Sequence, residues 1–130
     1  MHRWSVTTTG EFDRWFASLD GTTEGRSAQV EVIAKVELLK VCGPMLGRPH
    51  ADTLKGSRHA NMKELRATTG DAVLRVAFAF DPHRSAILLC AGNKAGVGEK
   101  RFYRTLLDRA DSLYDAHLRS LRTTRGKKKG

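Results

Sequence analysis

Apolar positions in the first part of the chain recur with the spacing of two amphipathic helices. Residues 3–7 are expected to form a short strand, and Thr8 followed by Glu11 is typical of the capping box that begins a helix. The apolar face of this first helix consists of Phe12, Trp15, Phe16 and Leu19. A second helix is expected over residues 27–41, where apolar side chains again fall on one face.

In the second half of the chain the apolar pattern changes to that of β-strands. Turn residues at hairpin length separate three short apolar runs, which predicts an antiparallel meander over 62–66, 72–80 and 85–91. After Gly98 the apolar residues return to helical spacing and predict a last helix that ends near residue 121. The order β-α-α-β-β-β-α predicts one α+β domain over residues 1–121, a small, mainly antiparallel sheet with helices packed on one face.

Side-chain alternation in the meander sets three charged residues apart from the apolar ones. The predicted core face of the second strand consists of Leu74, Val76, Phe78 and Phe80. Because successive side chains point to opposite faces of a strand, Arg75 lies on the other face. In the first strand Leu65 faces the core by the same reasoning, so Glu64 and Arg66 face away from it. We therefore expect Glu64, Arg66 and Arg75 to share the open face of neighbouring strands.

These three side chains suit chemistry on a phosphodiester. A guanidinium can stabilise the extra negative charge that a scissile phosphate acquires in the transition state. The carboxylate of Glu64 could accept the proton of an attacking 2′-hydroxyl. A solvated surface pair, or a structural salt bridge, would explain the same pattern.

Positive charge is concentrated in two segments of the chain. The formal net charge is +9 at pH 7, and residues 119–130 carry six basic side chains and no acidic one. Residues 48–94 hold eight basic and four acidic side chains. A basic surface attracts phosphate backbones, and such binding weakens with salt. The tail, residues 122–130, has no apolar anchor and is expected to be disordered.

Several classes of site and location are disfavoured by the sequence. Cys42 and Cys90 show no metal-ligand spacing and are expected to be buried thiols. No phosphate-binding or dinucleotide fingerprint is present. No run approaches the ~18 apolar residues of a membrane span, and no apolar run follows the N-terminal charges as in a signal peptide. We expect a cytoplasmic protein with no metal, no cofactor and no membrane contact.

Four strings in order resemble one family of bacterial toxins. TLKGSRHANMKELR, LRVAFAFDP, AILLCAGNKAG and FYRTLLDRADSLYDAHL are similar to the HigB-like branch of the RelE/ParE superfamily, of the phage-derived type found in actinobacteria. The resemblance covers residues 2–119 and implies the RelE-like element order. It also implies a metal-independent, ribosome-associated endoribonuclease (mRNA interferase) that inhibits translation. The implied partners are mRNA, the ribosome and a cognate helix-turn-helix antitoxin, through which alone the toxin would reach operator DNA.

The resemblance also implies catalytic residues. Arg75 matches the arginine of the family's Y-R-I/L strand motif, and Arg66 matches that of the E-L-R strand. Lys94 matches the basic residue after the last strand, where relatives often read F-x-K-K. Here residues 91–94 read AGNK, without the aromatic residue and one of the basic ones. Glu64, the candidate base, stands where some relatives carry a basic residue.

A second group of residues is expected to line the path of the RNA. Its members are Lys55, Arg58, His59, Lys63 and Tyr103. His59 could act instead as a general acid or base, since histidine titrates near neutral pH. Tyr103 could stack on a base, a contact worth about 1–3 kcal/mol, or only pack against its neighbours.

Two other functions remain compatible with the sequence. A ParE-like protein shares the fold and poisons DNA gyrase without catalysis, but such proteins generally lack the catalytic cations. A plain RNA-binding module would explain the charge but not the order of the motifs. The combination of Arg66, Arg75 and Lys94 therefore favours the nuclease.

Overall fold

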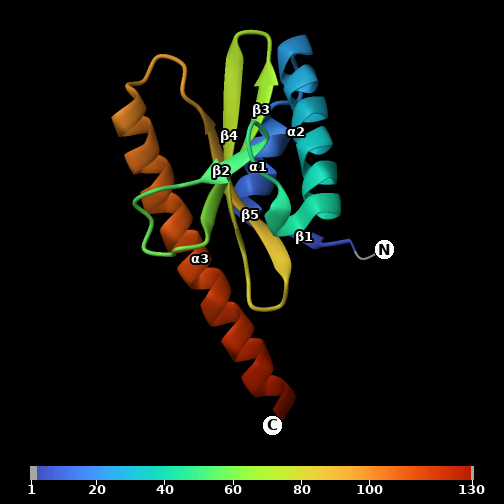
Figure 1. Cartoon of the computed structure of the whole chain (residues 1–130), viewed down its shortest axis with the longest axis vertical. Coiled ribbons are helices and arrows are strands. Elements are labelled where there is room, and N and C mark those ends of the chain that lie inside the picture. The colour runs from blue at the N-terminus through green and yellow to red at the C-terminus, as the bar shows by residue number, and fades with distance from the viewer. Residues whose placement is uncertain (1–2, 130) are drawn as a thin grey trace.

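A five-stranded sheet separates the helices of the protein into two layers (Figure 1). The computed structural model describes residues 3–129, with side chains up to residue 123. The strand order is β1-β5-β4-β3-β2, and only β1 and β5 pair in parallel. The strands are β1 (Ser5–Thr8), β2 (Ala51–Thr53), β3 (Met62–Thr69), β4 (Ala72–Phe80) and β5 (Ser85–Asn93). The helices are α1 (Gly10–Ser18), α2 (Thr23–Cys42), the short η1 (Gly43–Met45) and α3 (Glu99–Lys129). The predicted α+β class is confirmed.

The antiparallel meander lies where the apolar runs predict it. Strands β3, β4 and β5 are consecutive neighbours in the sheet, and β3 and β5 extend a few residues beyond the predicted runs. In the register of β3 and β4, Arg66 lies directly opposite Arg75. The strand β2 was not predicted, because three residues are too few to show a period. It pairs with β3 and adds a fourth strand to the antiparallel part of the sheet.

Both N-terminal helices begin at a threonine cap. Thr9, one residue after the predicted cap, accepts a hydrogen bond from the backbone N–H of Phe12 (3.0 Å), and its hydroxyl donates to the carbonyl of Leu89 (2.6 Å). Thr22 caps α2 by accepting from the N–H of Gly25 (2.9 Å). The second helix therefore begins four residues earlier than the apolar pattern predicts.

The core has two parts, one on each face of the sheet. On the first face α1 and α2 cover a cluster that includes Phe12, Val32, Leu39, Leu65, Val76, Phe78 and Leu88. On the second face α3 covers a cluster that includes Met62, Ala77, Ala79, Leu89, Phe102, Leu106, Ala110 and Tyr114. The expectation that the helices pack on one face is therefore wrong. The small residues Ala77 and Ala79 on β4 leave room for the apolar stripe of α3.

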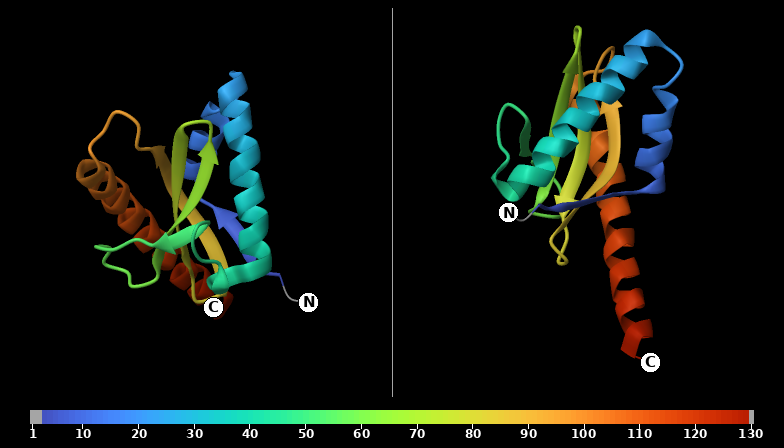
Figure 2. Two further views of the ribbon diagram at one scale, coloured as in Figure 1. Left: turned by 45° about the horizontal axis from the view of Figure 1, so that its top comes forward. Right: turned by 90° about the vertical axis from the view of Figure 1, so that its right-hand side faces the viewer.

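The last helix continues past the predicted end of the domain. It ends at Lys129 rather than near residue 121, and its C-terminal part projects beyond the sheet (Figures 1 and 2). The basic segment 122–129, predicted to be disordered, continues the helix, and Gly130 lies outside the described residues. Among the helices described, none combines the length and apolar character needed to cross a bilayer.

Candidate active site

The buried carboxylate of Glu64 is the centre of a polar cluster on the face that α3 covers. Its side chain is only 3% exposed. One oxygen, Oε2, accepts hydrogen bonds from Arg66 Nη2 (2.7 Å) and Nε (3.1 Å). The other, Oε1, accepts from the hydroxyl of Tyr103 (2.8 Å) and lies 3.5 Å from Nε of Arg75. A single carboxylate thus joins side chains from β3, β4 and α3.

The two guanidinium groups project to the same side of the sheet, as alternation predicts. Arg66 and Arg75 are cross-strand partners, and like charges in such a position repel each other. The carboxylate of Glu64 contacts both guanidinium groups and offsets this repulsion. Arg66 Nη2 also lies 3.4 Å from Oδ2 of Asp52 on β2. The side chain of Arg66 is 31% exposed and that of Arg75 is 12% exposed, so Arg66 is the more accessible of the two.

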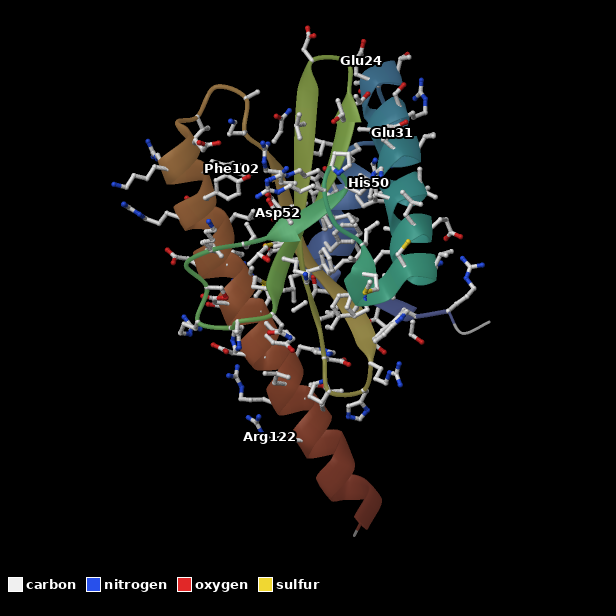
Figure 3. The ribbon with its side chains drawn as sticks, viewed as in Figure 1. Glu24, Glu31, His50, Asp52, Phe102 and Arg122 are labelled. Atoms are coloured by element: carbon white, nitrogen blue, oxygen red, sulfur yellow. The ribbon has the colours of Figure 1, made fainter. Side chains whose placement is uncertain are left out.

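Aromatic rings of α3 cover Arg75. Its Cζ atom lies 5.6 Å from the ring centre of Tyr103 and 6.0 Å from that of Phe102, within the range of cation–π contacts. Figure 3 shows Phe102 on the first turns of α3 and Asp52 on β2. Nη1 of Arg75 donates to the carbonyl of Val73 (3.3 Å), whereas Nε makes no hydrogen bond within the described part of the chain. Arg75 is therefore held in place, with its buried Nε directed at Glu64 at a distance too long for a hydrogen bond.

A cavity of about 450 Å³ lies beside Arg75 and also contacts Lys94. Lys94 follows β5 directly, and its Nζ donates to Glu99 at the start of α3 (3.3 Å). Asn93 and residues 95–97 of the loop that leads into α3 also line the cavity, as does the acidic residue Asp71. Two cations that converge on one hollow suit an anion the size of a phosphate group.

Two side chains of the cluster, Arg66 and Tyr103, have raised pKa values. The hydrogen bond to Glu64 raises the pKa of the Arg66 guanidinium, and this outweighs the opposite effect of burial. Burial and the hydrogen bond to Glu64 raise the pKa of the Tyr103 phenol. Near neutral pH, Arg66 is therefore a cation and Tyr103 a neutral donor.

Arg58 and His59 belong to a different cluster. The backbone N–H of Arg58 donates to Asp111 (3.1 Å), its guanidinium pairs with Asp115, and His59 Nε2 lies 2.8 Å from the same Asp115. His59 also packs edge-on against Tyr114 at 4.7 Å. Asp111 and Asp115 follow Tyr103 by two to three helical turns, roughly 12–18 Å along the axis. These contacts fasten the loop after β2 to α3, away from Glu64.

The two remaining predicted residues also lie apart from the cluster. Lys63 alternates with Glu64 on β3, so its side chain points to the face of α1 and α2. Lys55 is exposed in the loop after β2. Of the predicted residues, the structure brings together Glu64, Arg66, Arg75 and Tyr103, with Lys94 across the adjoining cavity.

Sequence reasoning missed two contributors to this cluster. Asp52, which contacts Arg66, lies in a strand of three residues that shows no period. Phe102, which covers Arg75, was assigned only to the apolar stripe of the last helix. Its position beside Tyr103 is the one signal that could have drawn attention to it.

The sequence of the chain is similar to those of known proteins. The family described as "Phage derived protein Gp49-like (DUF891)" matches residues 14–115, which include every candidate residue named above. The chain is 42% identical over 126 residues to "Putative toxin HigB2" of Mycobacterium tuberculosis (strain ATCC 25618 / H37Rv), covering 96% of this chain and 61% of that relative. It is 41% identical over 110 residues to "Putative toxin HigB3" of the same strain, covering 85% of this chain and 90% of that relative. The chain thus spans less than two thirds of the first relative and most of the second.

Proposed function

Because the chain belongs to the phage-derived Gp49-like family, a family of RelE/HigB-type toxins, we propose that it is the toxin of a toxin–antitoxin pair and cleaves mRNA. The observation that carries this proposal is the pair of cations, Arg75 and Lys94, that line one cavity next to the Glu64 cluster. These two cations match the charge of a phosphodiester, and one acidic residue, Asp71, lines the cavity with them.

In the proposed reaction Arg75 and Lys94 bind the non-bridging oxygens of the scissile phosphate. The 2′-hydroxyl of the preceding ribose loses its proton to solvent and attacks the phosphorus. The bond to the 5′ oxygen breaks and that oxygen takes up a proton from solvent, so a 2′,3′-cyclic phosphate and a 5′-hydroxyl result. The negative charge on the phosphate increases in the transition state, where preorganised donors stabilise it most. The proposed reaction requires no metal ion, as the resemblance to the family implies, because the side chains of Arg75 and Lys94 neutralise the charge of the phosphate.

Glu64 has two possible roles, which its surroundings distinguish. A general base must reach the proton that it removes, whereas this carboxylate is 3% exposed and already accepts hydrogen bonds from Arg66 and Tyr103. Its geometry therefore supports the role of orienting the guanidinium groups better than that of accepting a proton. The role of base stays a prediction from the sequence.

The partners follow from the family and are part of the proposal. A toxin of this kind requires a cognate antitoxin, which we expect to be a helix-turn-helix protein that links the pair to operator DNA. Its substrate would be mRNA on the ribosome, in the cytoplasm. The net charge of +9 suits binding both to mRNA and to the RNA of the ribosome.

The test compares growth and transcripts after expression of the wild type and of Arg75→Ala. We expect the wild type to arrest growth and to create new 5′ ends in mRNA. Loss of one charge-stabilising donor lowers such rates by about 10²–10³-fold, so Arg75→Ala should abolish both effects. Arg26→Ala, an exposed change on α2, is the matched control and should behave as the wild type.

Two results would contradict the proposal. One is full growth arrest and unchanged cleavage by a folded Arg75→Ala variant, as judged by circular dichroism. The other is growth arrest by the wild type with intact transcripts and blocked DNA supercoiling in a parallel gyrase assay. That second result would indicate a ParE-like gyrase poison.

A further inference from the structure

A second cavity, of about 560 Å³, adjoins the one that holds Arg75 and Lys94. It lies between the first turns of α3, the end of β5 and Glu11 of α1. Gly96 and Val97, in the loop before α3, line both cavities. A chain molecule bound in the first cavity can therefore continue directly into the second.

The walls of this cavity are suited to a flat, apolar group. Its inner surface includes Ala91, Val97, Phe102 and Leu106. Gly92 on β5 is needed here, because a Cβ at this position would lie 3.1 Å from the ring of Phe102. The volume falls within the roughly 300–1,000 Å³ of small-molecule sites. One nucleobase with its ribose fits a space of this size and character.

A carboxylate and a guanidinium stand side by side at the rim. Nε of Arg109 on α3 donates to Oε1 of Glu11 on α1 (2.6 Å). Both side chains line the cavity. The side chain of Arg109 is 54% exposed and that of Glu11 is 29% exposed, so a ligand can reach them. A carboxylate accepts two N–H donors, whereas a guanidinium only donates. The rim therefore offers acceptors and donors next to each other.

Guanine is the RNA base whose edge matches this pair. Its Watson–Crick edge carries the acceptor O6 beside two donors, N1–H and the N2 amino group. O6 accepts from arginine in DNA complexes too, where the arginine reaches it from the major-groove edge together with N7. Adenine and cytosine each present one amino group on this edge, and uracil presents a single ring N–H. Glu11 can thus accept from both guanine donors while Arg109 donates to O6.

We propose that this cavity binds a guanine base next to the scissile phosphate, with Glu11 and Arg109 as its specificity-determining residues. The inference rests on the proposed nuclease function, since it assigns a neighbour to the phosphate bound by Arg75 and Lys94. Arg101, which also lines the cavity, is placed to contact the next phosphate of the strand.

The first test measures binding of mononucleotides to the full chain by NMR and calorimetry. Guanosine 5′-monophosphate should shift the amide signals of Val97, Thr105 and Leu106 and bind at least about tenfold more tightly than the adenosine, cytidine or uridine monophosphate. Glu11→Gln should remove this preference, and Thr105→Trp, which fills the cavity, should remove binding. Glu31→Gln on α2 is the matched control, and thermal unfolding verifies that each variant is folded.

The second test maps cleavage sites in cells. The wild type should cut with a guanine beside the broken bond, and Glu11→Gln should still cut but with a preference reduced about tenfold or more. Cleavage without a guanine preference, together with no effect of the guanosine nucleotide on these signals, would overturn the guanine site and leave the nuclease standing. Selective guanosine binding without any cleavage by the wild type would overturn the nuclease and leave the guanine site standing.

Discussion

The side chain of Glu64 shows how a buried charge is accommodated in this protein. A carboxylate with 3% exposure is unfavourable unless donors surround it. Arg66 and Tyr103 supply these donors, and Arg75 adds a positive charge at 3.5 Å. Removing one partner of such a buried pair costs about 3–5 kcal/mol, because the other charge is left uncompensated. Glu64 and the arginines therefore depend on each other for the stability of the fold.

The hydroxyl of Tyr103 can be tested separately from its ring. Tyr103→Phe keeps the aromatic cover over Arg75 but removes the hydrogen bond to Glu64 Oε1. We expect the protein to fold and the rate of RNA cleavage to fall about tenfold, which corresponds to about 1.4 kcal/mol of transition-state stabilisation. Initial rates on purified ribosomes would measure this.

Two comparisons make that measurement decisive. Tyr103→Ala, which removes the ring as well, should reduce cleavage further than Tyr103→Phe. Cleavage by Tyr103→Phe at the full rate would show that the residue acts through its ring alone, by packing or by stacking on a base.

At the scale of residues, the local periodicity of the sequence predicts some contacts of the candidate site and not others. The shared face of Glu64, Arg66 and Arg75 follows from alternation within two strands, which depends only on nearby residues. The partners Asp52 and Tyr103 come from β2 and α3, so their contacts depend on tertiary packing that no local pattern encodes. The same holds for Arg58 and His59, which carry charge suited to RNA but contact Asp111 and Asp115.

The turn between α1 and α2 depends on a close backbone contact. An ideal Cβ on Gly25 would lie 1.7 Å from the carbonyl oxygen of Leu19. Within a helix, alanine is favoured over glycine by about 0.8–1 kcal/mol. The contact must outweigh this preference, because two atoms cannot approach so closely without a shift of the backbone.

Gly25→Ala is therefore expected to destabilise the protein. Overpacking of this kind costs about 1–3 kcal/mol, and we expect a net loss of about 1–2 kcal/mol in the free energy of unfolding. Gly47→Ala is the matched control, since no atom lies within 4 Å of the added Cβ. Urea denaturation of both variants would measure the difference, and a Gly25→Ala variant more stable than the wild type would refute the explanation.

Most of the elements that the sequence predicts have a repeated apolar spacing, although the short strand β1 was predicted without one. The meander and the three helices were identified, but the start of α2 was placed at residue 27 instead of Thr23, because its first turn is polar apart from Gly25. The strand β2 forms because β3 offers it hydrogen bonds, and its own sequence shows little preference. The sequence could not predict on which face of the sheet α3 lies. The apolar stripe of α3 indicates only that one side of the helix is buried, and it does not distinguish the two faces of the sheet.

At the scale of the molecule, several polar contacts fix α3 to the sheet. His117 Nε2 lies 2.8 Å from Oδ2 of Asp81, and the hydroxyl of Tyr114 donates to the carbonyl of Phe80 (3.0 Å). Asp81 lies in the turn between β4 and β5, and its side chain is 3% exposed. Burial alone would raise the pKa of Asp81, but hydrogen bonds from His117 and from two backbone N–H groups outweigh it and lower the pKa.

A lowered carboxyl pKa makes the attachment of α3 sensitive to acid. The contribution of Asp81 to stability is complete above the pKa of an unfolded aspartate, about 3.9, and is lost as the pH falls through the lower folded value. We expect the unfolding temperature of the wild type to fall steeply below about pH 4. Asp81→Asn should lose about 1.5–3 kcal/mol at pH 7 and show a weaker dependence on pH in the acid range.

The matched control for this measurement is Asp20→Asn, an exposed change at the end of α1. It should keep the steep acid dependence of the wild type. Calorimetry between pH 2.5 and 7 would compare the three proteins. The same acid dependence in Asp81→Asn as in the wild type would show that other carboxylates account for it.

The parallel pairing of β1 with β5 bears on the order in which the protein can be completed during synthesis. Ser5 lies opposite Ser85. The strand β1 is synthesised first, and it cannot pair until β5 has been synthesised. Contacts of such high sequence separation form slowly and raise the contact order of a fold. Tyr103 and the rest of the aromatic cover over Arg75 emerge later still. Under the proposed function, a nascent chain therefore lacks the assembled cluster around Glu64 for most of its synthesis, and the ribosome that makes it is protected from cleavage until the chain is nearly complete.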